Sequence, residues 1–232
     1  MRSDLSSFLQ APLLGRLVRL GAAVLTLGVT LAGCSQPIEP GPARGAALFD
    51  TCAPCHGDAG EGNRDLGAPA IAGMESWYVA KQLEKFSAGI RGSHPDDPEG
   101  LRMGPMARSL RDGDIASVSE HVASLPAHPR AATLGGDAAA GQAAYGVCTA
   151  CHGPDGRGNK ALGAPSLLIA DDWYLARQIE KFQSRVRGAD PRDTTGAQMA
   201  PMAATLATEQ SIANVLAYVT SLNGGTTPKE TP

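Results

Sequence analysis

The sequence is organised around one short motif, Cys52-Ala53-Pro54-Cys55-His56, which returns as Cys148-Thr149-Ala150-Cys151-His152. The two copies lie 96 positions apart and use four of the five cysteines of the 232-residue chain. A glycine follows the histidine in both copies. Because the residues around the motif repeat at the same offset, the motif belongs to a duplicated unit.

The duplication covers most of the chain. Its offset is constant, so no insertion separates the copies, and the period is longer than that of ordinary solenoid repeats. The matching blocks are Leu66–Pro69 with Leu162–Pro165, Trp77-Tyr78 with Trp173-Tyr174, Glu84–Phe86 with Glu180–Phe182, Arg91-Gly92 with Arg187-Gly188, and Met103–Ala107 with Met199–Ala203. We predict two tandem domains, residues 43–126 and 137–224, joined by a linker over residues 127–136. Residues 225–232 are predicted to form a disordered tail.

Local patterns predict an all-α fold. Residues 45–51 and 141–147 predict short helices that run into the motifs, with Phe49 and Tyr145 packed against the last helix of each domain. Residues 75–88 and their copy repeat apolar residues at helical spacing. Asp112 and Thr208 are predicted to be the N-cap residues of the final helices.

The first 33 residues have the composition of an export signal. Arginines surround the start of an apolar run from Leu20 through Ala32, which is too short for a comfortable bilayer span. The run ends in Leu31-Ala32-Gly33-Cys34, which resembles the bacterial lipobox, where the cysteine becomes a lipidated N-terminus. We predict a lipoprotein signal peptide over residues 1–33 and lipidation of Cys34. A plain signal peptide and an uncleaved anchor helix are the alternatives.

The Pro-rich residues 34–42 are predicted to be a tether between the lipidated cysteine and the folded body. Without residues 1–33 the net charge is −5, compared with −3 for the full sequence. A chain with no basic excess is a poor partner for nucleic acid, and we predict no such partner.

Cys-x-x-Cys-His is the attachment signature of a c-type heme. Each thiol can add across one vinyl group of the heme, and the adjacent histidine then reaches the iron. A zinc site, a redox dithiol and two structural disulfides are the alternatives. These alternatives do not account for the whole repeated pattern, because each cysteine pair belongs to its own copied unit and the histidine recurs in both. We predict two covalently bound heme c groups, attached through Cys52, Cys55, Cys148 and Cys151, with His56 and His152 as iron ligands.

A second iron ligand has to occur in both copies. The histidines outside the motifs do not repeat; these are His94, His121 and His128. Two methionine pairs do repeat, Met103 with Met199 and Met106 with Met202, in segments that we expect to be Pro-containing loops. A thioether ligand raises the reduction potential of a heme, as suits an electron carrier. The repeat alone does not decide which of the two methionine pairs supplies the iron ligands.

With these motifs, residues 43–224 resemble a diheme class I cytochrome c, and the cytochrome c4 group in particular. In that family the ligand methionine lies seven residues before a leucine that precedes the last helix. Met103 and Met199 have this spacing from Leu110 and Leu206. The resemblance therefore implies Met103 and Met199 as axial ligands, and Met106 and Met202 as wall residues.

Other repeated residues have roles that the resemblance only suggests. The carbonyls of Pro69 and Pro165 are implied to accept the ring N–H of the histidine ligand. The Trp-Tyr pairs, Trp77-Tyr78 and Trp173-Tyr174, either line the heme or pack in the core. Arg91 and Arg187 either pair with heme propionates or are solvated.

The resemblance implies a periplasm-facing, lipid-anchored electron carrier between respiratory redox partners, with no catalytic site. A terminal oxidase or a quinol-oxidising complex is the implied kind of partner, and Ser35 after Cys34 favours the outer membrane. A permanent subunit of an oxidase or dehydrogenase complex is an alternative. A diheme peroxidase-like enzyme is another, but it needs an open iron, against which the two copied methionine segments argue.

Overall fold

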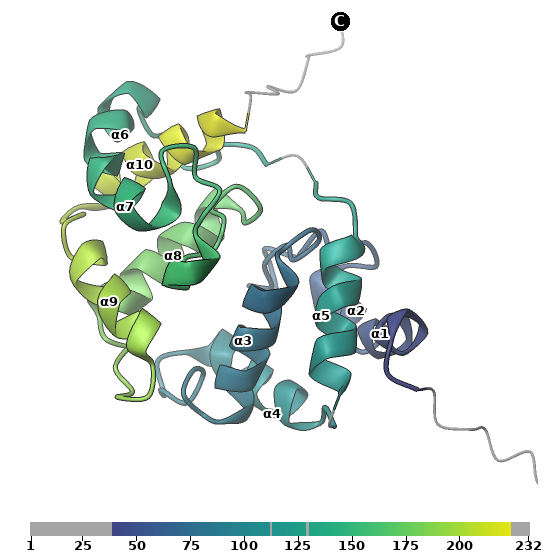
Figure 1. The fold of residues 1–232 in the computed structure, drawn as a ribbon. Coiled ribbons are helices and arrows are strands. Elements are labelled where there is room, and N and C mark those ends of the chain that lie inside the picture. The colour runs from purple at the N-terminus through teal and green to yellow at the C-terminus, as the bar shows by residue number, and fades with distance from the viewer. Residues whose placement is uncertain (1–38, 112, 129, 224–232) are drawn as a thin grey trace, which may run out of the picture. The chain divides into compact units, whose positions relative to one another are not determined.

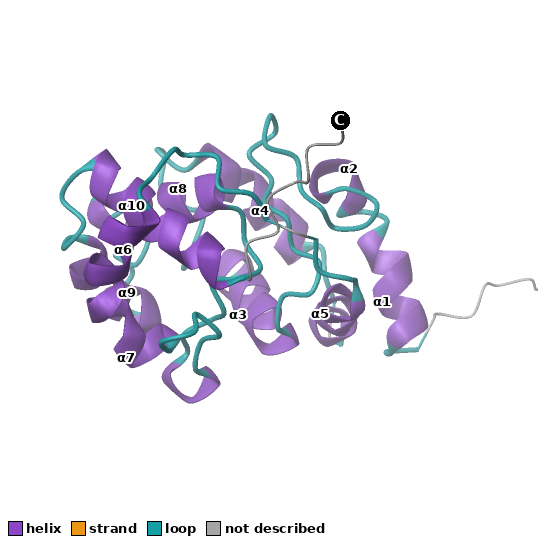
Figure 2. Cartoon of the chain, turned by 90° about the horizontal axis from the view of Figure 1, so that it is seen from above, coloured by secondary structure: helices purple, strands orange, loops and turns teal. Residues whose placement is uncertain are grey.

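The computed structural model describes residues 39–111, 113–128 and 130–223, which form a series of short helices (Figure 1). In the first half these are α1 (Pro42–Phe49), α2 (Ala53–His56), α3 (Ser76–Ser87), α4 (Pro98–Arg108) and α5 (Asp114–Ser124). In the second half they are α6 (Ala138–Ala144), η1 (Tyr145–Cys148), α7 (Thr149–His152), η2 (Lys160–Leu162), α8 (Asp172–Gln183), α9 (Thr194–Ala203) and α10 (Glu209–Leu222). Within the described residues there is no sheet, and the extended pairing consists of the isolated bridges Asn63–Ala68 and Asn159–Ala164 (Figure 2).

The first and last helices of each half pack against one another. α1 lies against α5, and α6 lies against α10. The ring of Phe49 contacts that of His121 on α5 with centroids 5.2 Å apart, and Tyr145 contacts Tyr218 on α10 with centroids 5.3 Å apart. The predicted packing of Phe49 and Tyr145 against the final helices is confirmed.

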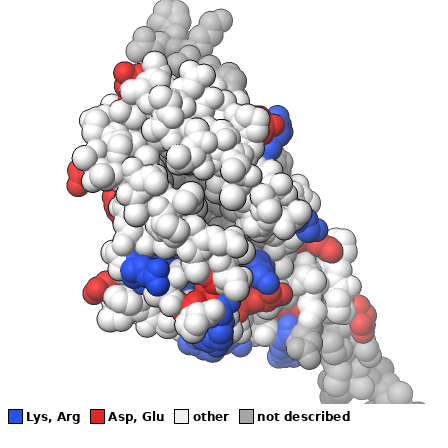
Figure 3. All heavy atoms as spheres, turned by 60° about the vertical axis from the view of Figure 1, so that its left-hand side comes forward, with Lys and Arg blue, Asp and Glu red and all other residues white. Residues whose placement is uncertain are grey.

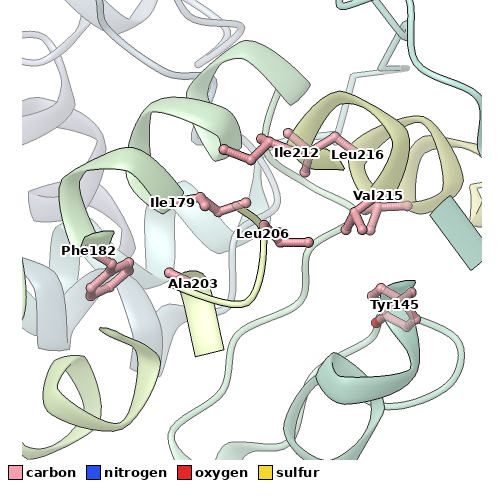
Figure 4. Packing of buried hydrophobic residues seen from close by; sticks show 9 residues of the cluster. Tyr145, Ile179, Phe182, Ala203, Leu206, Ile212, Val215 and Leu216 are labelled. Carbon is pink, nitrogen blue, oxygen red and sulfur yellow. The ribbon is translucent and has the colours of Figure 1, made fainter. Parts of the chain in front are cut away.

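The core of the second half lies where α8, α9 and α10 meet the start of η1 (Figure 4). Its buried members are Tyr145, Ile179, Phe182, Ala203, Leu206, Ile212, Val215, Leu216 and Val219. Met199 is half-buried and packs against this cluster. The first half buries Phe49, Phe86 and Ala107 at the matching positions, so both copies use the same framework.

Helix starts follow the local sequence. Thr208 is the N-cap of α10, as predicted, and it forms a capping box with Ser211. α5 begins at Asp114 with Gly113 in the N-cap position, whereas the predicted cap, Asp112, lies outside the described residues. α1 begins at Pro42, inside the predicted tether, because a proline at the first helical position has no hydrogen bond to lose.

The expectation that the Met-x-Pro-Met segments are loops is wrong, since both lie in the helices α4 and α9. Asp97 and Asp193 start these helices by accepting the backbone N–H of Gly100 and Gly196 at 2.9 Å. Pro105 lacks the N–H that would bond four residues back, but α4 continues only to Arg108. A proline so near the end of a capped helix is tolerated.

The linker is fastened to the second half. Asp172, the first residue of α8, accepts hydrogen bonds from the backbone and hydroxyl of Thr133 and from the backbone N–H of Leu134. Arg130 donates to the carbonyl of Ile169 at 2.6 Å. These contacts hold the connection between the two halves against the start of α8.

Several predictions concern residues outside the described ranges. These are the signal peptide over residues 1–33, the lipidation site Cys34, the first part of the tether and the tail over residues 225–232. Among the residues that the structure does describe, no helix is both long enough and apolar enough to span a bilayer.

Candidate functional site

Each Cys-x-x-Cys-His motif ends in a one-turn helix, α2 or α7. The turn places the two cysteines of a motif close together and buries the histidine at its end, so that His56 and His152 are each 8% exposed. The second cysteine of each pair is exposed and the first is half-buried. Burial raises the pKa of the first thiol, Cys52 or Cys148, and its neighbouring cysteine adds to the rise.

The two histidines are held in the orientation that a metal ligand needs. His56 Nδ1 lies 2.8 Å from the carbonyl oxygen of Pro69, and His152 Nδ1 lies 2.9 Å from that of Pro165. A carbonyl can only accept, so Nδ1 donates and a neutral ring keeps the lone pair on Nε2. Burial lowers the pKa of both histidines, against the opposing effect of the carbonyl, and this favours the neutral ring. The implied role of the two prolines is confirmed.

Two of the alternatives to heme, the structural disulfides and the zinc site, find no support among the described residues. All four motif cysteines are free thiols, so the structure contains neither of the two disulfides. In the part of the chain that the structure covers, no three Cys, His, Asp or Glu side chains come together as a metal-binding group. A zinc site built from the two cysteine pairs would require such a group.

The two methionines of each segment differ in exposure. Met103 and Met199 are half-buried, whereas Met106 is 39% exposed and Met202 is 42% exposed. Met103 lies on α4 between the buried residues Gly100 and Ala107, on the same side of the helix. Met106 and Met202 are thus the more exposed pair, and the role implied for them stays a prediction.

Arg91 is buried, at 8% exposure, and not solvated. Its guanidinium donates to Gln82 of its own half at 2.8 Å, and to Tyr174 and Gln178 of the other half at 2.9 and 3.0 Å. Arg91 Nε is buried without a hydrogen-bond partner among the described residues. A buried donor of this kind needs an acceptor, and a heme propionate is a suitable one, so the residues present fit the predicted cofactor.

Arg187 makes the reciprocal contacts. It donates to Gln178 of its own half at 2.9 Å, and to Tyr78 and Gln82 of the first half at 3.2 and 3.0 Å. The solvated alternative is wrong for this arginine too, since it is 8% exposed. The tyrosines Tyr78 and Tyr174 thus use their hydroxyls to join the two halves.

Ion pairs across the same boundary were not anticipated from the sequence, and Glu99 takes part in two of them, with Arg177 and Lys181. Lys85 pairs with Asp193 and Lys181 pairs with Asp97, both at matching positions of the repeat. The lysine and the aspartate each recur in both copies of the repeat, and this recurrence is the sequence signal that could have indicated the ion pairs.

Charged side chains are unevenly distributed over one face of the molecule. Figure 3 shows one face on which Lys, Arg, Asp and Glu lie mainly toward the lower part. The upper part of that face is largely uncharged and is hollowed near its centre.

Comparison with known proteins places these features in a family. The cytochrome c family profile matches residues 42–126 and again residues 138–223. The chain is 31% identical over 191 residues to the thiosulfate dehydrogenase electron acceptor of Stutzerimonas stutzeri, covering 78% of this chain and 84% of that protein. It is also 31% identical over 217 residues to cytochrome c4 of Azotobacter vinelandii, covering 86% and 96% of the two chains.

A solved structure gives the same relationship. The crystal structure of reduced recombinant cytochrome c4 from Pseudomonas stutzeri aligns with a TM-score of 0.60 at 28% identity, covering 78% of this chain and 98% of that one. The predicted fold, two tandem helical cytochrome c domains, is thereby confirmed. The predicted cofactors, two heme c groups, and the predicted class, an electron carrier and not an enzyme, are confirmed with it. The chain therefore belongs to the cytochrome c family, as a cytochrome c4-like protein with two heme c domains.

Proposed function

We propose that this diheme cytochrome carries electrons between redox proteins on the periplasmic side of a bacterial membrane, to which a lipid at Cys34 anchors it. The observation that carries the proposal is the double occurrence of one arrangement. In each copy a buried histidine is oriented by a proline carbonyl, and a half-buried methionine lies on a helix at the same offset.

The cysteines attach the cofactors and the histidines bind them. Cys52 and Cys55 hold the first heme as thioethers, and Cys148 and Cys151 hold the second. When bound, each heme supplies one-electron chemistry through its iron. His56 and His152 offer Nε2 to the iron, because Nδ1 is engaged by a proline carbonyl.

Met103 and Met199 would supply the remaining ligand to each heme iron. Their half-buried position on α4 and α9 supports this choice over Met106 and Met202, which face solvent. A thioether favours the reduced metal and occupies the face that a small substrate would need. This ligand set suits a carrier of relatively high potential.

The charge of the mature chain indicates the kind of partner. A net charge of −5 without residues 1–33 favours a redox protein with a basic docking patch. A relative is named as the electron acceptor of thiosulfate dehydrogenase, which supports a periplasmic dehydrogenase as donor. A terminal oxidase or a quinol-oxidising complex remains the proposed partner on the other side of the transfer.

The axial ligands are tested by four single variants in the heme-loaded protein. Met103→Ala and Met199→Ala should each lower the potential of one heme and allow carbon monoxide to bind there. Each should also remove about half of the far-red sulfur-to-iron band of the ferric protein. The matched variants Met106→Ala and Met202→Ala should leave that band intact. Stoichiometric binding of carbon monoxide to the unaltered protein at neutral pH would instead favour a peroxidase-like enzyme.

The anchor is tested separately. Cys34→Ala should release the protein from the membrane fraction without changing its heme spectrum, because Cys34 precedes both domains. An Ala variant that stays with the membrane would show that another segment or a permanent partner retains the protein. Density fractionation of the unaltered protein distinguishes the outer membrane, which Ser35 favours, from the inner one.

A further inference from the structure

Each half of the molecule extends a lysine to the other half, and Lys85 is buried whereas Lys181 is half-buried. Lys85 on α3 places Nζ 2.6 Å from Oδ1 of Asp193, and Lys181 on α8 places Nζ 2.5 Å from Oδ1 of Asp97. The side chains of the first pair are 9% and 2% exposed, and those of the second are 12% and 4% exposed. Both pairs join the same two repeat positions in opposite directions, so the contact is reciprocal.

The aspartates in these pairs are also helix caps. Asp97 Oδ1 accepts the backbone N–H of Gly100 at 2.9 Å, and Asp193 Oδ1 accepts that of Gly196 at 2.9 Å. The oxygen that receives the lysine of one half therefore also fixes the first turn of α4 or α9 in the other half. These are the helices that carry Met103 and Met199.

A second contact strengthens each attachment. Lys85 Nζ also donates to the hydroxyl of Thr195 at 2.8 Å, and Lys181 Nζ donates to Glu99 Oε2 at 2.8 Å. Glu99 and Thr195 lie in the first turns of α4 and α9 and occupy equivalent positions of the repeat. Each lysine thus holds two side chains at the start of the opposite methionine helix.

We propose that Lys85 is a positioning residue for Met199 and that Lys181 is a positioning residue for Met103, so that the axial ligation of each heme depends on the other domain. The inference rests on the proposed assignment of Met103 and Met199 as iron ligands. The physical reason is the shared aspartate oxygen. Without its lysine, each buried carboxylate loses its hydrogen-bonded countercharge, and the turn that it caps is free to shift.

The test is a crossed pair of variants in the full-length, heme-loaded protein. Lys85→Met and Lys181→Met remove the charge and keep the length of the side chain. In the reduced protein, each ligand methionine has a methyl resonance that the heme ring current shifts upfield, and Met103→Ala and Met199→Ala assign the two signals. Lys85→Met should shift or broaden the Met199 signal and spare that of Met103, and Lys181→Met should do the opposite.

Added imidazole provides a second measurement, because it competes with a loosened methionine for the ferric iron. In Lys85→Met its affinity for the second heme should rise roughly tenfold, with no change at the first heme. Lys85→Arg should restore the unaltered behaviour in part. Lys81→Met is the matched control, since Lys81 lies on the same helix with an exposed side chain, and it should change neither signal.

The outcomes separate the inference from the function on which it rests. Absence of both methyl signals from the unaltered protein would reject methionine ligation itself. Intact ligation that is unchanged in both lysine variants, or changed only in the lysine's own domain, would overturn the inference. If Lys85→Met does not load heme, Asp193→Asn gives the same test, because an amide oxygen keeps the cap but loses the ion pair. It should also alter the Met199 signal, and an unaltered signal would reject the proposal.

Discussion

A single hydroxyl distinguishes the two halves at the aromatic residue before each motif. Tyr145 is 1% exposed, and its hydroxyl donates to the carbonyl oxygen of Gly153 at 2.8 Å, directly after His152. Phe49 takes the same position in the first half and has no hydroxyl. The second motif is therefore tied to the preceding helical segment by a side-chain hydrogen bond that Phe49 cannot make.

Tyr145→Phe should lower the free energy of unfolding by about 1 kcal/mol at neutral pH, because the Gly153 carbonyl loses its buried donor. Burial raises the pKa of Tyr145 to about 12. The unfolded chain loses this proton near pH ~10, so the unaltered protein should lose stability as the pH rises above that value. Denaturant titrations of both proteins at neutral and alkaline pH check this. If the unaltered protein and Tyr145→Phe lost the same free energy of unfolding at alkaline pH, this prediction would be contradicted.

The sequence pattern predicts which helices exist better than it predicts where each helix begins and ends. The apolar spacing indicated α3 and α8, and Thr208 indicated the start of α10, because these signals are local. Pro105 and Pro201 favour the predicted loops, but Asp97 and Asp193 cap helices that continue through both prolines. Whether a proline ends a helix depends on how many turns follow it.

The pairing of α1 with α5, and of α6 with α10, depends on glycine at the point of closest approach. A Cβ at Gly45 would collide with the carbonyl of Ser117, and one at Gly141 would collide with that of Asn214. Backbone atoms cannot give way as a flexible side chain can. Gly141→Ala or Gly45→Ala should therefore destabilise its half by about 1–3 kcal/mol, as overpacking does.

Gly146→Ala is the matched control for this prediction. No atom lies within 4 Å of a Cβ at Gly146, and its φ is not in the left-handed region. Alanine there should be neutral, or stabilising by about 0.4–1 kcal/mol, because it restricts the unfolded chain. Thermal unfolding of the three heme-loaded variants measures the difference. A Gly141→Ala protein as stable as Gly146→Ala would show that the helices can separate without cost.

At the scale of the whole molecule, sequence repetition indicated two domains but not how they meet. Several residues that join the domains occupy equivalent positions of the two copies. Arg91 is equivalent to Arg187, and Lys85 is equivalent to Lys181. A polar residue kept in both copies can serve its own heme or the opposite domain, and the spacing does not distinguish these roles. Tyr78 and Tyr174 illustrate this, since their hydroxyls accept hydrogen bonds from arginines across the boundary whatever else their rings contact.

Asp97 and Asp193, which pair with lysines of the opposite half, should make the stability of the molecule depend on pH in the acidic range. Burial alone would raise the pKa of Asp97 and Asp193. Hydrogen bonds from the opposite lysine and from a backbone N–H outweigh burial, so the pKa of each lies below its usual value. A carboxyl with a lowered pKa stabilises the fold above the pKa of the unfolded chain, about 3.9, and this contribution is lost as the pH falls through the folded-state value.

The double variant Asp97→Asn/Asp193→Asn should therefore be less stable than the unaltered protein at neutral pH, yet lose less stability on acidification to about pH 3. Because the two substitutions replace only these carboxyls, the difference between the pH profiles reports those groups. Denaturant unfolding at several pH values measures it, with Asp58→Asn/Asp65→Asn, two exposed sites, as the charge-matched control. Parallel pH profiles for the unaltered protein and the interface variant would show that the ion pairs contribute nothing to joining the domains. A flattened profile in the interface variant alone would place the acid sensitivity of the molecule at the contacts that also start its methionine helices.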